Sequence, residues 1–433
     1  MPHVHYGEMS ELCYNLPMFR KLYSIVIKVR TWGLSGVFDY LKKLPHDFVL
    51  TKFLKSNAKA FPYLVPERGI TLIGKFSGSG SASKTLRDFA FALKAARIPF
   101  QTFDTCDNKA RMSAEDCHGI MTPRSEFRLK RYDHIVEIFP SILPPSLRAK
   151  HARIAFWEFE SGFLHGYPDM PNEQCVIAMS DFNAVYFSRI LPQCTVHKIL
   201  YPFHLLEKNF DNSIAIRRKY NIPVNAFMVF FNFDFNAGMN RKNPLGAINA
   251  FAQAFKATPN THLVIKTKGA KTHPEEYESM MTYIKSLGIS QQFTAINAYI
   301  PEPDIYGLTS AADVYLSLHR GEGFGITLAE AMYMGKPVIC TNWSSTTEFC
   351  KDDCTIPIPY KMTPVKAEEV DHPYYQDVVE WADPDVDAAA EALKQLHSDP
   401  KLRDLLGQRA AQSIREQFSI ANFKESVERF LDS

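Results

Sequence analysis

Short apolar runs alternate with amphipathic stretches along most of this chain, and the alternation starts near Gly69. In the first half, such runs predict buried strands at 70–74, 98–103, 134–139, 153–157, 175–179 and 196–201. The stretch 84–96 lies between the first two runs and has the apolar spacing of a helix. Short buried strands that alternate with helices are typical of a parallel sheet with helices on its faces.

A second series of the same kind begins near Phe227. The predicted strands are 228–233, 262–266, 293–297, 313–318 and 338–340, and the predicted helices are 244–255, 275–287, 306–312, 326–334, 387–397, 400–418 and 420–431. We therefore predict an α/β protein whose two Rossmann-like domains face each other across a cleft and meet near residue 205. Ligands of such sheets bind beyond the carboxyl ends of the strands, so the cleft is the expected active site.

Four parts follow from this pattern. They are a basic, partly helical extension at 1–66, a first Rossmann-like domain at 67–205, a second at 206–415, and a last helix at 416–433 that packs back on the first domain. Residues 1–60 carry nine Lys/Arg and four Asp/Glu, and 19–32 has an apolar and a basic side when drawn as a helix. Two interpretations stay open: peripheral membrane contact through 18–33, or a helix packed on the protein's own body.

Composition narrows the function classes. A formal charge of +2 over 433 residues argues against general nucleic-acid binding. Eight scattered cysteines without a C-x-x-C pair favour reduced thiols, and no matching His/Cys pair accompanies Cys350 and Cys354, so no zinc site is expected. Basic residues interrupt the first apolar run, and no run reaches the ~18–20 residues of a spanning helix. We expect a cytoplasmic protein, either free or peripheral at the inner face of the membrane.

The stretch 320–340, RGEGFGITLAEAMYMGKPVIC, predicts a strand end, a glycine loop, a helix and a further strand. Free N–H groups and the helix dipole make a glycine loop at a helix start suitable for a phosphate. Glu322 lies on this loop, and Glu330 lies about two turns into the helix. A phosphate site beside two acids suggests a ligand with phosphates and hydroxyls, such as a nucleotide sugar.

Two cations, Arg241 and Lys242, lie in the turn between the predicted strand 228–233 and the helix 244–255. Fixed cations of this kind stabilise the charge that develops on a departing nucleoside diphosphate. Lys266, at the end of the next strand, is a weaker candidate, because a strand-end lysine is often only exposed.

The first half offers further candidates. Gly78 and Gly80 lie in a Ser/Gly loop after the first strand, where backbone could approach a phosphate or an acceptor. Trp157 and Glu158 follow a predicted strand and could stack on a sugar ring and bond its hydroxyls; the alternative is a buried tryptophan beside solvated acids. His134 is a candidate for the donor-sugar side, although a lone histidine is more often structural.

The stretch 320–349 resembles the E-x7-E segment of the group 1 family of retaining glycosyltransferases (glycosyltransferase family 4), and the turn at 241–244 is similar to the family's diphosphate-binding turn. The resemblance spans roughly 69–432 and implies a GT-B fold, with 67–205 as acceptor domain and 206–415 as nucleotide-sugar donor domain. It implies that Glu322 contacts donor sugar hydroxyls, Glu330 binds the ribose, and Lys242 and Arg241 neutralise the leaving group. The backbone N–H groups of this segment would meet the diphosphate: Gly323, Phe324, Gly325, Ile326, Thr327.

One departure from the family pattern concerns the second cation. Group 1 enzymes carry an arginine five or six positions before the lysine, and 236–237 is Asn-Ala here, so Arg241 is the substitute. The nucleobase is expected to meet the backbone near Tyr299. No cofactor or essential metal is expected, and the donor is a UDP- or GDP-linked sugar.

The predicted function is transfer of a sugar from a nucleotide sugar to a glycan or lipid-linked acceptor, with retention of the anomeric configuration. Two alternatives remain. A nicotinamide oxidoreductase would need G-x-G-x-x-G after the first strand, and the 78–83 loop lacks the third glycine. A non-catalytic protein that binds sugar nucleotides is the other.

Overall fold

The computed structural model describes residues 52–53, 55–57, 66–78, 80–106, 119–123, 126–129, 131–138, 151–162, 175–203, 213–370, 375 and 377–433. The chain divides into two compact units, one of Met1–Pro62 with Ile142–Leu147 and one of Tyr63–Ser141 with Arg148–Ser433. Only 52–53 and 55–57 of the first unit are described, and they are helical. The amphipathic helix predicted at 19–32 lies outside the described residues.

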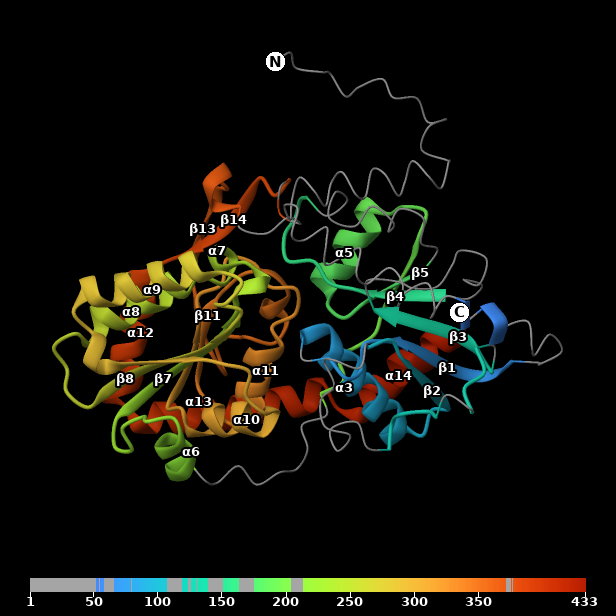
Figure 1. Ribbon diagram of the computed structural model, residues 1–433, viewed down its shortest axis with the longest axis horizontal. Helices are drawn as coiled ribbons and strands as arrows, with labels where there is room; N and C mark the ends of the chain where they lie inside the picture. The colour runs from blue at the N-terminus through green and yellow to red at the C-terminus, as the bar shows by residue number, and fades with distance from the viewer. Residues whose placement is uncertain are drawn as a thin grey trace, which may run out of the picture. The chain divides into compact units, whose positions relative to one another are not determined.

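The first sheet is parallel throughout and has the order β2-β1-β3-β4-β5-β6 (Figure 1). Its strands are β1 (Glu67–Gly74), β2 (Phe100–Asp104), β3 (Tyr132–Ile138), β4 (His151–Ala155), β5 (Cys175–Ala178) and β6 (Thr195–Lys198). Helices α3 (Ser81–Ala96) and α5 (Asp181–Ile190) accompany it. α3 begins three residues before the predicted start at 84, because Gly80 takes the N-cap position and the serines form the first turn.

The second sheet is also parallel, with the order β12-β11-β10-β7-β8-β9. Its strands are β7 (Phe227–Asp234), β8 (Thr261–Lys268), β9 (Phe293–Asn297), β10 (Val314–Ser317), β11 (Val338–Thr341) and β12 (Ile356–Ile358). The helices are α6 (Ser213–Lys219), α7 (Met239–Lys242), α8 (Pro244–Phe255), α9 (Pro274–Leu287), α10 (Glu302–Ala311), α11 (Ile326–Tyr333), α12 (Val386–Ser398), α13 (Pro400–Gln417) and α14 (Ile420–Leu431). Short 3-10 helices lie at Phe235–Ala237, Ser290–Gln292, Ser344–Glu348 and Ala367–Glu369.

The α/β prediction is therefore confirmed, with two parallel sheets that the apolar runs located to within a few residues. Helix α5, helix α6 and strand β12 had not been predicted. A two-stranded antiparallel sheet of β13 (Tyr360–Pro364) and β14 (Glu380–Pro384) was missed as well. Both of its strands mix polar and apolar residues on a partly exposed ribbon, so they give no apolar run.

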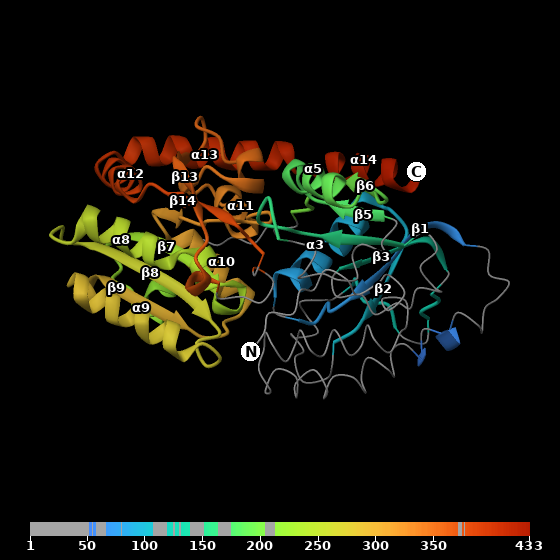
Figure 2. The ribbon, with the colours of Figure 1, turned by 90° about the horizontal axis from the view of Figure 1, so that it is seen from above.

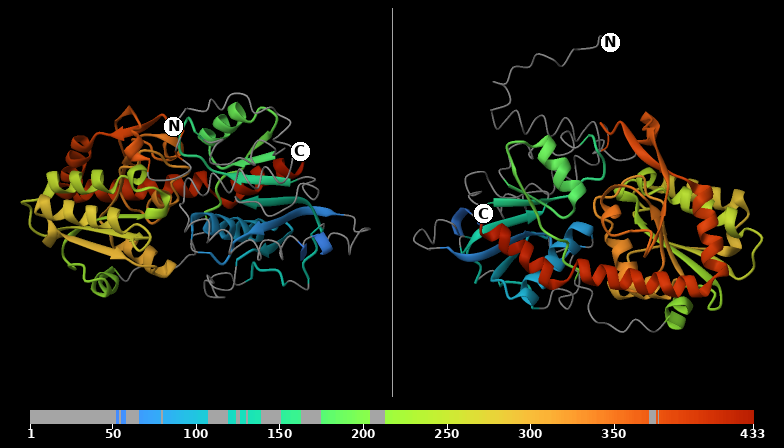
Figure 3. Two further views of the ribbon diagram at one scale, coloured as in Figure 1. Left: turned by 45° about the horizontal axis from the view of Figure 1, so that its top comes forward. Right: turned by 180° about the vertical axis from the view of Figure 1, so that it is seen from behind.

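The two last helices follow each other along the same side of the molecule, α13 beside the second sheet and α14 beside the first (Figures 2 and 3). Phe423 of α14 packs edge-to-face on Phe89 of α3, with ring centroids 5.2 Å apart. At its end, Asp432 pairs with Arg68 at the start of β1. The C-terminal helix is thus anchored on the first sheet domain by apolar packing and an ion pair.

Candidate functional site

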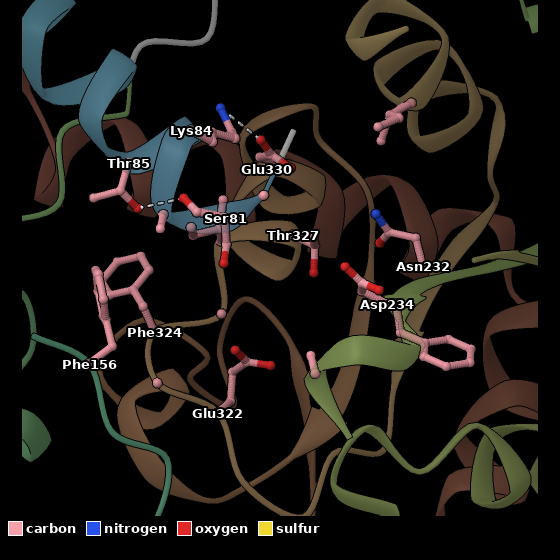
Figure 4. A pocket seen from close by; sticks show the side chains of 18 of the residues that line it. Ser81, Lys84, Thr85, Phe156, Asn232, Asp234, Glu322, Phe324, Thr327 and Glu330 are labelled. Carbon is pink, nitrogen blue, oxygen red and sulfur yellow. Dashed lines mark hydrogen bonds and ion pairs between the residues drawn. The ribbon is translucent and has the colours of Figure 1, made fainter. Parts of the chain in front are cut away.

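The carboxyl ends of both sheets open into one pocket with a volume of about 450 Å³ (Figure 4). This volume lies within the range usual for small-ligand sites. The first sheet domain contributes the start of α3 and the segment after β4, including Ser81, Lys84, Phe156 and Glu158. The second domain contributes the strand ends, the glycine loop and α11. The pocket therefore lies where ligands of open α/β sheets bind.

The glycine loop that leads into α11 takes a conformation that side chains would not allow. Gly325 is the N-cap of α11 with φ of 94°, and a Cβ there would lie 2.6 Å from Thr346 Cγ2. At Gly321, a Cβ would lie 2.9 Å from the carbonyl oxygen of Glu158. These glycines let the loop approach its neighbours closely, as the sequence predicted.

Side chains on two other segments fix the backbone of this loop. Ser344 Oγ donates to the carbonyl of Glu322 (2.9 Å) and accepts from its N–H (3.2 Å). The carbonyl of Gly323 accepts from Asn183 Nδ2 and from Ser345 Oγ, each at 2.8 Å. Asn183, on α5, was not predicted as a site residue, since nothing in its local sequence shows that it reaches the glycine loop.

Three charged side chains, Arg241, Lys242 and Glu158, lie around Glu322. Lys242 Nζ forms an ion pair and hydrogen bond with Glu322 Oε2. Arg241 lies 3.9 Å from Glu322 and 3.8 Å from Glu158. Burial alone would raise the pKa of Glu322, but the fields of Lys242 and Arg241 outweigh it and lower the pKa to about 2. Burial raises the pKa of Glu158, and Arg241 only partly offsets this effect.

Arg241 has a second role that its sequence position did not reveal. Its Nη1 donates to the carbonyl of Gly321 (2.8 Å), its Nε donates to the carbonyl of Ala237 (3.1 Å), and the residue is almost fully buried. The guanidinium therefore supports the backbone of the glycine loop. Because these hydrogen bonds fix its position, it contributes an immobile positive charge to the pocket.

Lys266 lies in the pocket wall and has no ion-pair partner among the described residues. It lies near the end of β8, in register with Asn232 of β7, and is 6% exposed. Its ammonium forms no ion pair or hydrogen bond with any residue the structure describes, whereas the neighbouring Lys268 pairs with Asp234 at 3.1 Å. Burial and the charge of Lys268 lower the pKa of Lys266 to about 8. An anion that enters the pocket can thus meet Lys266 without breaking an existing pair.

Glu330 faces the pocket from α11, and Lys84 of α3 reaches across to it (Figure 4). The distance from Lys84 Nζ to Glu330 Oε1 is 3.2 Å. Burial raises the pKa of Glu330 to about 7, although Lys84 pulls it down. Lys84 was not predicted as a site residue, because its carboxylate partners on α10 and α11 are distant in sequence.

Most of the other residues named from the sequence also lie in the pocket wall. Gly80, Gly323, Phe324, Ile326, Thr327 and Tyr299 all line the pocket, and Tyr299 is 59% exposed. Phe324 stacks on Tyr201, with ring centroids 4.6 Å apart, and so closes the pocket floor. The free N–H groups of α11 belong to its first turn, so this pocket-lining segment can offer them to a ligand.

Three predicted site residues lie elsewhere. Trp157 is 1% exposed and donates from Nε1 to the carbonyl of Ser161, so it is a core residue and cannot stack on a sugar. His134 is buried against Phe430 of α14, with rings 4.9 Å apart, which gives it a packing role rather than a place beside a donor sugar. Gly78 does not line the pocket, and its carbonyl accepts a hydrogen bond from Arg87.

The described residues contain no cluster of metal ligands and no membrane-spanning helix. No group of three or more His, Cys, Asp or Glu side chains in this part of the chain is arranged to hold a metal ion. None of the helices that the structure describes combines the length and the apolar character needed to span a bilayer.

Two parallel sheets, flanked by helices and with their carboxyl ends at one pocket, are the arrangement of the GT-B fold. Residues 213–356 match the family model of glycosyl transferases group 1, which confirms the resemblance drawn from the motifs. This segment contains Arg241, Lys242, Glu322 and Glu330. No curated protein sequence matches the chain.

Solved structures support the fold. HepE from Anabaena, in complex with UDP-glucose, is 15% identical with a TM-score of 0.59 over 84% of this chain and 100% of that one. Sucrose-phosphate synthase from Thermosynechococcus elongatus is 14% identical (TM-score 0.57; 84% and 98% covered). WaaG, a glycosyltransferase involved in lipopolysaccharide biosynthesis, is 16% identical (TM-score 0.53; 84% and 98% covered). At these identities the likeness establishes the GT-B fold and nothing finer.

Proposed function

We propose that this protein is a retaining glycosyltransferase that moves a sugar from a UDP- or GDP-linked donor to a glycan or a lipid-linked acceptor. The observation that carries the proposal is one pocket in which Lys242, Lys266, Glu322 and Glu330 surround the start of α11. The match of 213–356 to group 1 glycosyltransferases supports the same reaction class.

The cations account for departure of the nucleoside diphosphate. Negative charge grows on the leaving oxygen as the glycosidic bond breaks, and fixed positive groups stabilise that state more than the ground state. Lys242 and Lys266 would approach the diphosphate from the strand ends, while the N–H groups of Gly325 to Thr327 approach it from the helix. We propose that these groups make a metal ion dispensable.

Glu322 would accept hydrogen bonds from hydroxyls of the donor sugar. With its pKa near 2 and Lys242 beside it, Glu322 stays ionised at neutral pH, and a carboxylate of such low pKa is too weak a base to take the proton of the acceptor hydroxyl. Proton removal from the acceptor is therefore assigned to the departing phosphate, on the face from which it leaves. Attack from that same face gives retention at the anomeric carbon.

The hydrogen bonds of Asp104, at the end of β2, count against the nicotinamide oxidoreductase. In a dinucleotide-binding domain, an acid after the second strand binds the ribose. Here Asp104 ends β2, and its Oδ1 accepts from the N–H groups of Phe76 and Cys106, each at 3.0 Å. Its other oxygen accepts from Ser77 Oγ. Asp104 therefore holds the loop after β1 and is not free for a ribose.

The acceptor side is proposed from the first-domain wall. Ile138, Ile154, Ala155 and Phe156 form an apolar strip there, beside Glu158. Such a strip suits the less polar face of a sugar ring or a lipid-linked glycan. We also propose that residues 18–33 contact the inner face of the membrane, which would bring the enzyme to a lipid-linked acceptor.

Donor binding and turnover test the proposal together. Thermal unfolding with UDP-sugars, GDP-sugars and NAD should show stabilisation by one class of sugar nucleotide and none by NAD; at about a hundred times Kd the gain is about 2.7 kcal/mol. Glu322→Ala and Lys242→Ala should abolish turnover while the exposed control Lys271→Ala keeps it. Stabilisation by NAD alone, or unchanged turnover in both pocket variants, would overturn the proposal.

Three further measurements test its finer parts. NMR of the product should show the anomeric configuration of the donor, and inversion would refute retention. Turnover should survive EDTA if Lys242 and Lys266 replace a metal. Deletion of residues 1–60 should lower binding to anionic vesicles, and unchanged binding would refute the membrane contact.

A further inference from the structure

A cluster of charged side chains closes one end of the pocket. Lys84 Nζ lies 3.0 Å from Asp88, 3.5 Å from Glu302 and 3.2 Å from Glu330. All these side chains are largely buried, with exposures of 6% for Asp88, 23% for Glu302, 7% for Glu330 and 15% for Lys84. One ammonium thus serves three carboxylates that come from three different helices.

The three carboxylates are not equally satisfied. Asp88 also accepts from Tyr201 Oη at 2.9 Å, and Glu302 accepts from Tyr306 Oη at 2.8 Å. Glu330 Oε1 is buried and, among the described residues, accepts no hydrogen bond, although Lys84 faces it as an ion-pair partner. Lys84 offsets the charge of this buried oxygen but gives it no well-directed hydrogen bond, so the oxygen can still accept one from a ligand hydroxyl.

The charges around Glu330 leave it close to neutralisation. Asp88 and Lys84 face it from α3, Glu302 and Tyr306 from α10, and Tyr315 from β10. Arg87 adds a positive charge 3.9 Å from Glu302, and the hydroxyl of Tyr201 donates a hydrogen bond to Asp88. Three acids against two bases, in a buried site, favour uptake of one proton. The ammonium of Lys84 opposes this uptake at Glu330 more than any other group does.

We propose that Lys84 is a positioning residue for the donor: its ammonium keeps Glu330 ionised and turned toward the pocket, where the carboxylate accepts hydrogen bonds from the ribose hydroxyls. This inference rests on the proposed function, since it assumes a nucleotide-linked donor. It adds a residue of the first sheet domain to a donor site whose other members belong to the second.

The ribose contribution can be isolated by comparing a nucleotide with its 2′-deoxy form. The ratio of Kd values for 2′-deoxy-UDP and UDP, or for the two guanine nucleotides if GDP binds more tightly, cancels ionisation of the phosphates. A hydrogen bond to a carboxylate should make this ratio about tenfold at pH 8.5. At pH 6, below the pKa of Glu330, the ratio should fall to about twofold because the carboxylate is then mostly protonated.

The variants shift this profile in opposite directions. Lys84→Met removes the positive charge, so the rise in the ratio should move to higher pH and the ratio should stay near twofold at pH 8.5. Lys84→Arg should restore the wild-type profile. Glu302→Gln removes a negative charge and keeps a partner for Tyr306, so the rise should move to lower pH. Lys94→Met, an exposed lysine later in α3, is the matched control and should leave the profile unchanged.

Each outcome decides the matter. A wild-type ratio near one at every pH, with UDP or GDP still bound, refutes the role of Glu330 and Lys84 but leaves the proposed function intact. Failure of wild-type protein to bind either nucleotide refutes both. If Lys84→Met gives a larger ratio than wild type, Lys84 competes with the ribose instead of preparing its site. Should Lys84→Met fail to fold, an unshifted profile in Glu302→Gln would still overturn the inference.

Discussion

Replacing Asn183 with alanine should loosen the glycine loop before α11, although Asn183 itself does not line the pocket. Asn183 is fully buried on α5. Its Nδ2 donates to the carbonyl of Gly323 at 2.8 Å and its Oδ1 accepts from the backbone N–H of Trp157 at 2.6 Å. One amide thus ties the segment after β4 to the residue that follows Glu322.

The expected loss follows from which groups are left without partners. The carbonyl of Gly323 would keep Ser345 Oγ as a donor, whereas the buried N–H of Trp157 would lose its acceptor. One buried group without a partner costs roughly 1–3 kcal/mol, so the free energy of unfolding should fall by about 2 kcal/mol. A displacement of about 1 Å in a positioning element can cost roughly 10²-fold in rate, so kcat should fall about 10- to 100-fold.

Chemical unfolding and steady-state kinetics with the identified donor measure both effects. Ser345→Ala removes the other donor to Gly323, and the two residues share one carbonyl, so a double-mutant cycle should show a coupling above about 0.5 kcal/mol. Asn422→Ala, on the exposed start of α14, is the matched control for loss of an asparagine. Wild-type kcat in Asn183→Ala, together with additive effects in the double variant, would refute the reasoning.

The other predictions concern charge and backbone conformation in the same pocket. Lys266→Met should lower kcat about 10²-fold or more, because it removes the cation proposed to face the leaving group. The control Lys271→Met should leave kcat unchanged. Equal kcat values in the two variants would refute the proposed role of Lys266. Gly325→Ala should cost about 2 kcal/mol or more in unfolding free energy and weaken nucleotide binding, because of φ of 94° and contact with Thr346, and a wild-type Tm would contradict this. The pKa of Glu330 is raised from 4.5 to about 7, so the folded state binds more protons and unfolding free energy falls as pH rises between these values. In the Glu330→Gln variant, the unfolding free energy should fall by up to about 3 kcal/mol less than in wild type over this pH range. Parallel curves of unfolding free energy against pH for the two proteins would refute the raised pKa.

The sequence was most informative where function depends on local backbone. The run 313–340 predicted a strand, a glycine loop, a helix and a further strand, and the structure places them at β10, α11 and β11 with small changes in bounds. The glycine requirement is local as well, because φ at Gly325 and its contact with Thr346 follow from the tight turn itself.

Local sequence patterns did not predict the side-chain contacts between segments that are far apart in the chain. Lys84 looked like an ordinary helix residue, since its partner Glu330 lies 246 positions further along the chain. Trp157 follows strand β4 and His134 lies in strand β3, as the sequence predicted. The direction of each side chain, which the sequence did not reveal, decides its role. Trp157 turns into the core beside Phe159, and His134 turns toward α14.

Charge balance favours Lys266 of β8 over Arg241 of the α7 turn as the proposed partner of a diphosphate. Arg241 and Lys242 face Glu322 and Glu158, so these two cations are already offset by two acids. A diphosphate that relied on them alone would have to separate buried ion pairs, and the carboxylates left behind would be costly. Lys266 adds a positive charge that no acid in the described pocket offsets by an ion pair, and its lowered pKa means that an incoming anion would stabilise its charged form. Arg241 supports the glycine loop from the α7 turn, so the second cation for the diphosphate is better proposed at Lys266, near the end of β8.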